Sequence, residues 1–156
     1  MSQTPKSVIV IGGGGNLGPS ILTALTNELQ FNVSVLSRSN STSVFPANVR
    51  VVKISENYPE NELLEAFAGQ DAVVSTITHN SLTDQIRIID AAVKAGVKRF
   101  VPSDFGGSMS ETALQLAPFM NDKIAVQNHL NRSNQQPFLG PPQQSAHFLI
   151  GKPSHL

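Results

Sequence analysis

Short apolar runs alternate with amphipathic segments along most of the chain. Continuous aliphatic and β-branched runs are typical of strands buried on both faces of a parallel sheet. We expect such strands at residues 7–11, 32–38, 49–54, 71–77 and 97–102. Apolar residues at helical spacing lie between them, which predicts helices at 18–30, 60–68, 82–95 and 118–130. Strands that alternate with helices indicate βαβ units. The chain is therefore expected to be an α/β domain with a doubly wound parallel sheet.

The periodicity also predicts which helix faces are buried and where the helices end. The first helix is expected to bury Ile21, Leu22, Leu25 and Leu29. The third helix is expected to bury Ile86, Ile89, Ala92 and Val93. Gly69 and Gly96 follow the second and third helices and are expected to end them.

This pattern stops near Ser133. Residues 133–156 contain four prolines and four glutamines and have no clear period. We expect one domain over residues 1–132 and an irregular tail over 133–156. No strand is expected within 135–148, because proline removes donors from a strand ladder.

Composition narrows the classes of function. The 156 residues carry 11 basic and 11 acidic side chains, so the net charge is zero, and no basic excess points to nucleic acid or an anionic membrane. Cysteine is absent, which excludes disulfides, thiolate nucleophiles and cysteine-ligated metals. No apolar run approaches the ~20 residues that span a bilayer. No apolar targeting segment opens the sequence, so we expect a cytoplasmic protein.

Four consecutive glycines stand between the first expected strand and the first expected helix, in "VIVIGGGGNLGPSI". Glycines spaced as G-x-G-x-x-G in this context permit a tight turn, approach of backbone to a pyrophosphate, and close helix–strand packing. The helix N-terminus then offers free N–H groups to the phosphates. A merely flexible turn is the alternative. The predicted cofactor-binding residues of this turn, in a Rossmann fold, are Gly12, Gly13, Gly15, Asn16, Leu17 and Gly18.

The end of the second strand indicates which dinucleotide binds. An acidic residue there binds the ribose 2′-hydroxyl of NAD, whereas an arginine accommodates the 2′-phosphate of NADP. Arg38 lies 20 residues after Gly18, and no Asp or Glu occurs between residues 29 and 55. We predict that Arg38 selects NADP(H), with Ser37 and Ser39 as hydrogen-bonding neighbours. A solvated loop arginine is the alternative.

Other polar residues follow the fourth and fifth strands. Ligands of such sheets bind beyond the carboxyl ends of the strands, so Thr76, Ser103 and Phe105 are expected to face the cofactor. A Tyr-x-x-x-Lys pair cannot exist, because the single tyrosine, Tyr58, is followed four residues later by Glu62. Ser103 lacks a G-x-S-x-G elbow, and the histidines lack metal-ligand spacing.

The segments "GGGGNLG", "LSR", "GQDAVVSTIT", "AAVKAGVKRFVPSDFG" and "NDKIAVQNHL" resemble the NmrA-like, isoflavone-reductase-like family of atypical short-chain dehydrogenases over residues 7–132. Asp104 stands where that family usually has glutamate. The resemblance implies that NADP(H) is bound by the glycine turn and Arg38. It also implies that Lys123 is the catalytic general acid/base.

The resemblance leaves three functions open. The first is an NADPH-dependent reductase of a small substrate, with aromatic compounds as one class. The second is a non-catalytic, NADP-sensing regulator that contacts a protein partner. The third is an inactive fragment. Family members are about twice as long, with a sixth strand and a C-terminal substrate domain that we do not find in this sequence. We therefore expect a truncated product, and whether it turns over substrate stays open.

Overall fold

The computed structural model describes residues 5–77, 82–103, 120–133 and 136–137. Its centre is a parallel sheet with the strand order β3-β2-β1-β4-β5-β6. The strands are β1 (Ser7–Ile11), β2 (Asn32–Arg38), β3 (Arg50–Ile54), β4 (Ala72–Ser75), β5 (Arg99–Val101) and β6 (Gln136–Pro137). The order reverses between β1 and β4, which is the topological switch point of a doubly wound sheet.

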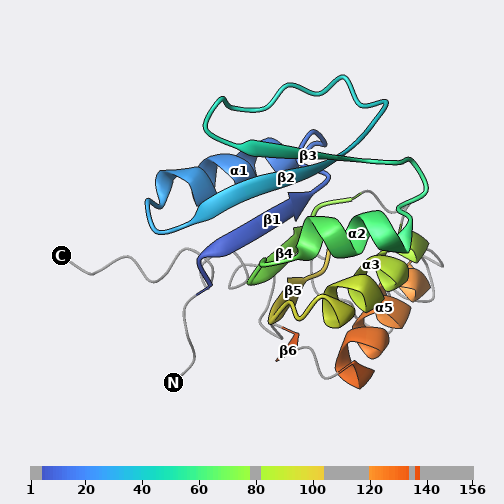
Figure 1. Ribbon diagram of the computed structural model, residues 1–156. Helices are drawn as coiled ribbons and strands as arrows, with labels where there is room; N and C mark the ends of the chain where they lie inside the picture. Colours follow the sequence, from blue (N-terminus) through green and yellow to red (C-terminus); the bar gives the residue numbers. More distant parts are fainter. Residues whose placement is uncertain (1–4, 78–81, 104–119, 134–135, 138–156) are drawn as a thin grey trace.

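Helices cover both faces of this sheet (Figure 1). They are α1 (Gly18–Asn27), α2 (Glu60–Phe67), α3 (Leu82–Lys94) and α5 (Met120–Arg132). Helix α1 lies on one face, and α2, α3 and α5 lie on the other (Figure 1). The predicted doubly wound parallel α/β fold is therefore confirmed.

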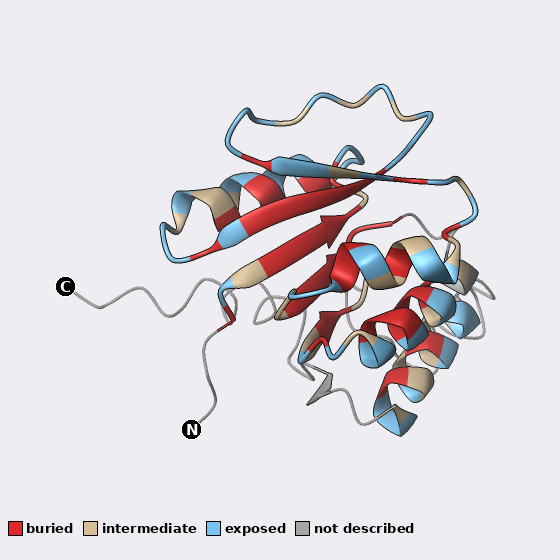
Figure 2. Cartoon of the chain, in the orientation of Figure 1, coloured by how far each residue is buried: buried red, intermediate tan, exposed pale blue. Residues whose placement is uncertain are grey.

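The continuous apolar strands are explained by burial on both faces. Along β1, Val8 and Val10 pack into the cluster beneath α1, while Ile9 and Ile11 pack into the cluster beneath the other helices. All four side chains are fully buried, as the red strands in Figure 2 show. Because each buried aliphatic side chain contributes about 1.5–3 kcal/mol, this strand strongly favours a central position.

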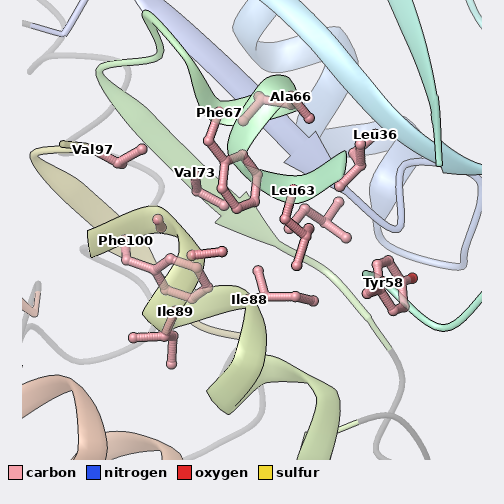
Figure 3. Close-up of a cluster of buried hydrophobic side chains, with 14 of the residues drawn as sticks. Leu36, Tyr58, Leu63, Ala66, Phe67, Val73, Ile88, Ile89, Val97 and Phe100 are labelled. Atoms are coloured by element: carbon pink, nitrogen blue, oxygen red, sulfur yellow. The ribbon is translucent and has the colours of Figure 1, made fainter. Parts of the chain in front are cut away.

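The larger cluster joins the sheet to α2 and α3. Figure 3 shows Phe67 and Leu63 of α2 packed towards Val73 of the sheet and Ile88 of α3, with Tyr58 at the edge of the cluster. Phe67 is fully buried and Leu63 nearly so. This packing fixes the segment that follows β3, which carries Tyr58, against the carboxyl edge of the sheet.

Two predicted helix faces were partly wrong. Helix α1 ends at Asn27, because Glu28 turns to an extended conformation, and Leu29 is 99% exposed. Phe31 is buried in its place. In α3, Val93 is exposed, whereas the polar Gln85 is buried. The buried residues of α3 are Gln85, Ile88, Ile89, Ala91 and Ala92. They keep helical spacing but include a polar residue that hydrophobicity does not reveal.

The expectation of no strand within 135–148 was also wrong. Strand β6 pairs in parallel with β5, with Gln136 opposite Arg99 and Pro137 opposite Phe100. This strand lies at the end of the described sheet, where only one side needs a ladder partner. Proline is tolerated at such an edge because its missing N–H is required least there.

The predicted helix ends at Gly69 and Gly96 are confirmed, with φ of +74° and +79°.

Asp71 connects two strands at their N-terminal ends, away from the glycine turn. Its carboxylate accepts hydrogen bonds from the backbone N–H groups of Lys6 and Ser7, at 2.9 and 3.0 Å. These bonds tie the start of β1 to the start of β4. No helix of the described residues is long and apolar enough to cross a membrane.

Candidate nucleotide-binding site

The glycine turn leaves β1 with a left-handed residue. Gly12 has φ +79°, and the N–H of Gly15 donates to the Gly12 carbonyl at 3.0 Å. A Cβ on Gly12 would lie 3.0 Å from backbone atoms of Thr76 and Ile77. Both the dihedral angle and the proximity of the β4 end therefore require glycine here.

Gly18 opens α1 directly against the turn. A Cβ on Gly18 would lie 2.4 Å from the carbonyl carbon and oxygen of Gly13 and 2.5 Å from the oxygen of Gly12. The helix start is thus held close to the strand end, which is the packing role that the last glycine of the fingerprint serves. Pro19 occupies the first turn and no side chain caps it, so its remaining free N–H groups can serve a ligand.

Gly13 and Gly14 receive a different neighbour, the loop between β2 and β3. A Cβ on Gly14 would lie 2.1 Å from Oγ of Ser43. One on Gly13 would lie 3.3 Å from the Phe45 ring, besides 2.8 Å from Val35 and 3.0 Å from Leu22. The sequence analysis treated residues 39–48 only as a loop. Its contact with the glycine turn shows that it forms one wall of the site.

A pocket of about 220 Å³ opens at the carboxyl edge of the sheet. It lies beside the switch point between β1 and β4, where doubly wound sheets bind ligands. Its lining residues are Gly12, Gly13, Gly14, Gly15, Leu36, Ser37, Arg38, Ser41, Ser43, Phe45, Tyr58, Thr76 and Ile77.

Six predicted site residues line this pocket, namely Gly12, Gly13, Gly15, Ser37, Arg38 and Thr76. Asn16, Leu17 and Gly18 continue the same turn but do not line the pocket. Phe105 lies outside the described residues. The structure therefore brings the glycine turn and the predicted NADP selector to one hollow.

A second cation and a carboxylate accompany Arg38 at the end of β2. The ammonium group of Lys53 donates to the Ser37 hydroxyl at 3.4 Å and to the carbonyls of Arg38 and Ser41 at 3.3 and 3.1 Å. The Glu56 carboxylate lies 3.6 Å from the Arg38 guanidinium. Sequence reasoning missed both residues. Lys53 could have been found as a charged side chain between the apolar Val52 and Ile54 of β3.

Tyr58 closes the pocket on the side of α2. It is buried and adopts φ +48°, the single positive φ among the described non-glycine residues. Burial raises the pKa of its phenol, and the neighbouring Asp84 and Glu56 carboxylates add to that rise against the opposing effect of Arg38. The hydroxyl is therefore uncharged at neutral pH.

Thr76 and Ser103 use their hydroxyls to hold strand ends together. The Thr76 hydroxyl donates to the Ile11 carbonyl at 2.8 Å, and the Ser103 hydroxyl donates to the Ile77 carbonyl at 2.7 Å. The buried Gln85 accepts a bond from the Ser103 N–H at 3.1 Å. Ser103 lies outside the pocket lining, so its contact with a cofactor stays a prediction.

Lys123 is half-buried in the first turn of α5. Helix α5 leads into β6, which is parallel to β5, so its N-terminus lies at the same sheet edge as the glycine turn. Lys123 is not among the residues that line the pocket. Its catalytic role stays a prediction.

In the described part of the chain, no group of three or more acidic or histidine side chains could hold a metal ion.

The strand order 3-2-1-4-5-6, with a glycine turn that opens a helix at the switch point, defines a Rossmann-type domain. The sequence profile of the NmrA-like family matches residues 4–140. The chain belongs to the NmrA-like family, as its motifs indicated.

Curated relatives carry oxidoreductase names. The chain is 50% identical over 99 residues to oxidoreductase aprR of Aspergillus flavus, covering 64% of this chain and 33% of the relative. It is 31% identical over 125 residues to isoflavone reductase homolog IRL of Zea mays, covering 73% of this chain and 40% of the relative. The matched segments thus cover well under half the length of these relatives.

Solved structures show the same fold. AtPrR2 with NADP+ and (+)pinoresinol superposes with a TM-score of 0.69 at 22% identity, over 88% of this chain and 49% of that chain. The complex of leucoanthocyanidin reductase with NADPH from Vitis vinifera gives a TM-score of 0.67 at 24% identity, over 84% and 45%. At these identities the likeness shows the fold alone.

Proposed function

We propose that this chain forms the NADP(H)-binding part of an oxidoreductase of the isoflavone-reductase type. One observation carries the proposal: the glycine turn and Arg38 line a single pocket at the switch point, and the Lys53 ammonium group is hydrogen-bonded to the Arg38 carbonyl. The oxidoreductase names of the relatives and the NADP+ or NADPH bound in the similar solved structures support it.

The residues present fit a dinucleotide. Gly14 and Gly15 present exposed backbone within the turn, and both line the pocket together with Arg38. This backbone and the N-terminus of α1 suit the pyrophosphate. Arg38 and Lys53 suit the 2′-phosphate. Thr76 and Ile77 form the wall of the pocket on the side where the nicotinamide half would lie.

The bound cofactor would supply the hydride for reduction. We assign the accompanying proton to Nζ of Lys123, as the family resemblance implies, with the substrate atom that receives the electron pair displaced by the hydride as its acceptor. The substrate class is a small aromatic compound. This class is consistent with the plant reductases among the relatives and with the pinoresinol named for AtPrR2.

A second candidate is an NADP-sensing regulator that contacts a protein partner and performs no reaction. The observation that favours it is the position of Lys123 outside the residues that line the nucleotide pocket. In this case the chain binds NADPH but does not consume it.

Calorimetry with NADPH and NADH on the wild-type chain and on Arg38→Ala tests the proposal. We expect NADPH to bind more tightly than NADH. Arg38→Ala should weaken NADPH binding roughly tenfold, which is the lower end of the about 1.5–3 kcal/mol for a hydrogen bond to a charged group, because the Arg38 side chain is 53% exposed. NADH binding should change little. Arg50→Ala is the matched control, because Arg50 is exposed at the opposite end of β3.

Failure of the folded chain to bind either nucleotide would refute the proposal. If NADPH binds, the two candidate functions are separated by Lys123→Ala and a screen of aromatic substrates. A reductase loses NADPH oxidation in this variant, whereas a sensor shows none in either form.

A further inference from the structure

The Glu56 carboxylate makes one ion pair and accepts two hydrogen bonds at the end of β2. Its oxygens lie 3.6 Å from the Arg38 guanidinium, 3.1 Å from the Asn40 backbone N–H and 3.4 Å from the Ser39 hydroxyl. Glu56 follows β3, and the parallel pairing of Arg38 with Ile54 brings it to this point. The donors are an arginine, a hydroxyl and a backbone N–H.

This set of donors matches what an oxyanion requires. A phosphate is bound in proteins by guanidinium groups, hydroxyls and backbone N–H groups. Arg38 and Ser39 also lie where a Rossmann domain meets the 2′-position of the adenosine ribose. The Glu56 carboxylate thus occupies the same hydrogen-bond donors that would suit a 2′-phosphate.

We propose that Glu56 is a specificity-determining residue that occupies the 2′-phosphate subsite and limits the preference for NADPH over NADH. The inference rests on the proposed NADP(H)-binding function. NADPH must displace the carboxylate from Arg38 and place a phosphate near its negative charge. The 2′-hydroxyl of NADH can instead donate a hydrogen bond to Glu56, as it does to the acidic residue of NAD-binding domains.

Lys53 keeps the subsite favourable for phosphate despite this competition. Its ammonium group donates to the Ser37 hydroxyl and to the carbonyls of Arg38 and Ser41, so it lies beside Arg38 at the end of β2. Among the contacts of the described residues it forms no ion pair with Glu56. The proposed 2′-phosphate subsite therefore contains two cations, Arg38 and Lys53, and one carboxylate, Glu56. Removing the carboxylate charge leaves both cations for the ligand.

The expected effect is modest because the groups are partly exposed. The side chains of Arg38 and Glu56 are 53% and 38% exposed, and exposed ion pairs give factors of roughly two to five in binding. Glu56→Gln should therefore strengthen NADPH binding roughly two- to fivefold. NADH binding should stay equal or weaken slightly, because an amide is a poorer acceptor than a carboxylate.

The experiment measures dissociation constants of NADPH, NADH, 2′,5′-ADP and 5′-AMP for the wild-type chain and Glu56→Gln. The glutamine amide oxygen can still accept the Asn40 N–H, so the loop retains a partner. Glu65→Gln is the matched control, since Glu65 is exposed on α2 and removes the same charge elsewhere. The expected result is tighter NADPH and 2′,5′-ADP binding in Glu56→Gln alone.

A second measurement uses the wild-type chain, so that it holds even if the variant does not fold. The amide resonance of Asn40 should shift on titration with 2′,5′-ADP, which displaces Glu56, and much less with 5′-AMP. An unmoved Asn40 resonance during saturable 2′,5′-ADP binding would overturn the inference.

The remaining outcomes separate this inference from the proposed function. If Arg38→Ala weakens NADPH binding but Glu56→Gln leaves the NADPH-to-NADH ratio at the wild-type value, the Glu56 inference is wrong and the function stands. If neither nucleotide binds the folded chain, both are wrong. An equal gain in Glu65→Gln would show a general charge effect and also overturn the inference.

Discussion

Gly18→Ala tests the close approach on which the site depends. The added methyl carbon would lie 2.4 Å from the Gly13 carbonyl, whereas ordinary Cβ contacts begin at 3.4 Å. The helix start and the turn must therefore separate by about 1 Å (3.4 − 2.4). Both partners are backbone, so no side-chain rotation can relieve the contact.

The magnitude follows from this geometry. Overpacking costs typically 1–3 kcal/mol, and the backbone contact places Gly18→Ala at about 3 kcal/mol. For a chain of this size each kcal/mol lowers the Tm by roughly 2–4 °C. We expect a fall in Tm of roughly 6–12 °C and a loss of NADPH affinity, because the N-terminus of α1 is moved away from the turn.

Thermal unfolding followed by circular dichroism, with NADPH calorimetry at a temperature where the variant is folded, measures both effects. Gly69→Ala is the control: its φ is +74° and nothing lies within 4 Å of an added Cβ. It should cost about 1–2 kcal/mol from the left-handed conformation and leave NADPH binding unchanged. A Gly18→Ala chain that melts within 2 °C of wild type, or binds NADPH equally well, would refute the reasoning.

Two further predictions concern the loop and the opposite edge of the sheet. Gly14→Ala should weaken NADPH binding with a smaller loss of Tm than Gly18→Ala, because its Cβ meets the Ser43 side chain rather than backbone; adding Ser43→Gly should restore binding, and no rescue would contradict the contact. Hydrogen bonds from the backbone N–H groups of Ser7 and Lys6, together with Lys98, hold the pKa of Asp71 below its usual range, so its stabilisation is present above about pH 4 and is lost as pH falls through the folded pKa. Asp71→Asn should therefore lower the urea midpoint at pH 7, with a gap to wild type that narrows near pH 3; a constant gap, or an equal loss in Asp122→Asn, would argue against this role.

Local patterns were sufficient for much of the fold. The strands near residues 7–11, 32–38 and 50–54 follow from continuous apolar runs, and Gly69 and Gly96 marked helix ends because left-handed residues favour glycine. The end of α1 could not be predicted in this way. Leu29 continues the helical spacing, but Phe31 fills the core after the chain turns at Glu28.

Polar residues in buried positions escaped the sequence analysis for a related reason. Gln85 is 1% exposed because its side-chain oxygen accepts the Ser103 N–H, a partner 18 residues away. A hydrophobicity pattern treats glutamine as a surface residue and cannot include its hydrogen-bonding partner. The same limit applied to β6, whose pairing with β5 depends on its position at the sheet edge.

The sequence by itself determined the strand–glycine–helix unit and Arg38, because those residues act through spacing within one short segment. Only the tertiary structure decided what surrounds Arg38. Lys53 and Glu56 lie 15 and 18 residues beyond it, and the parallel pairing of β2 with β3 brings them to its side. Parallel strands align their carboxyl ends regardless of the loop between them, so the charge balance of the site is set by sheet register rather than by any local motif.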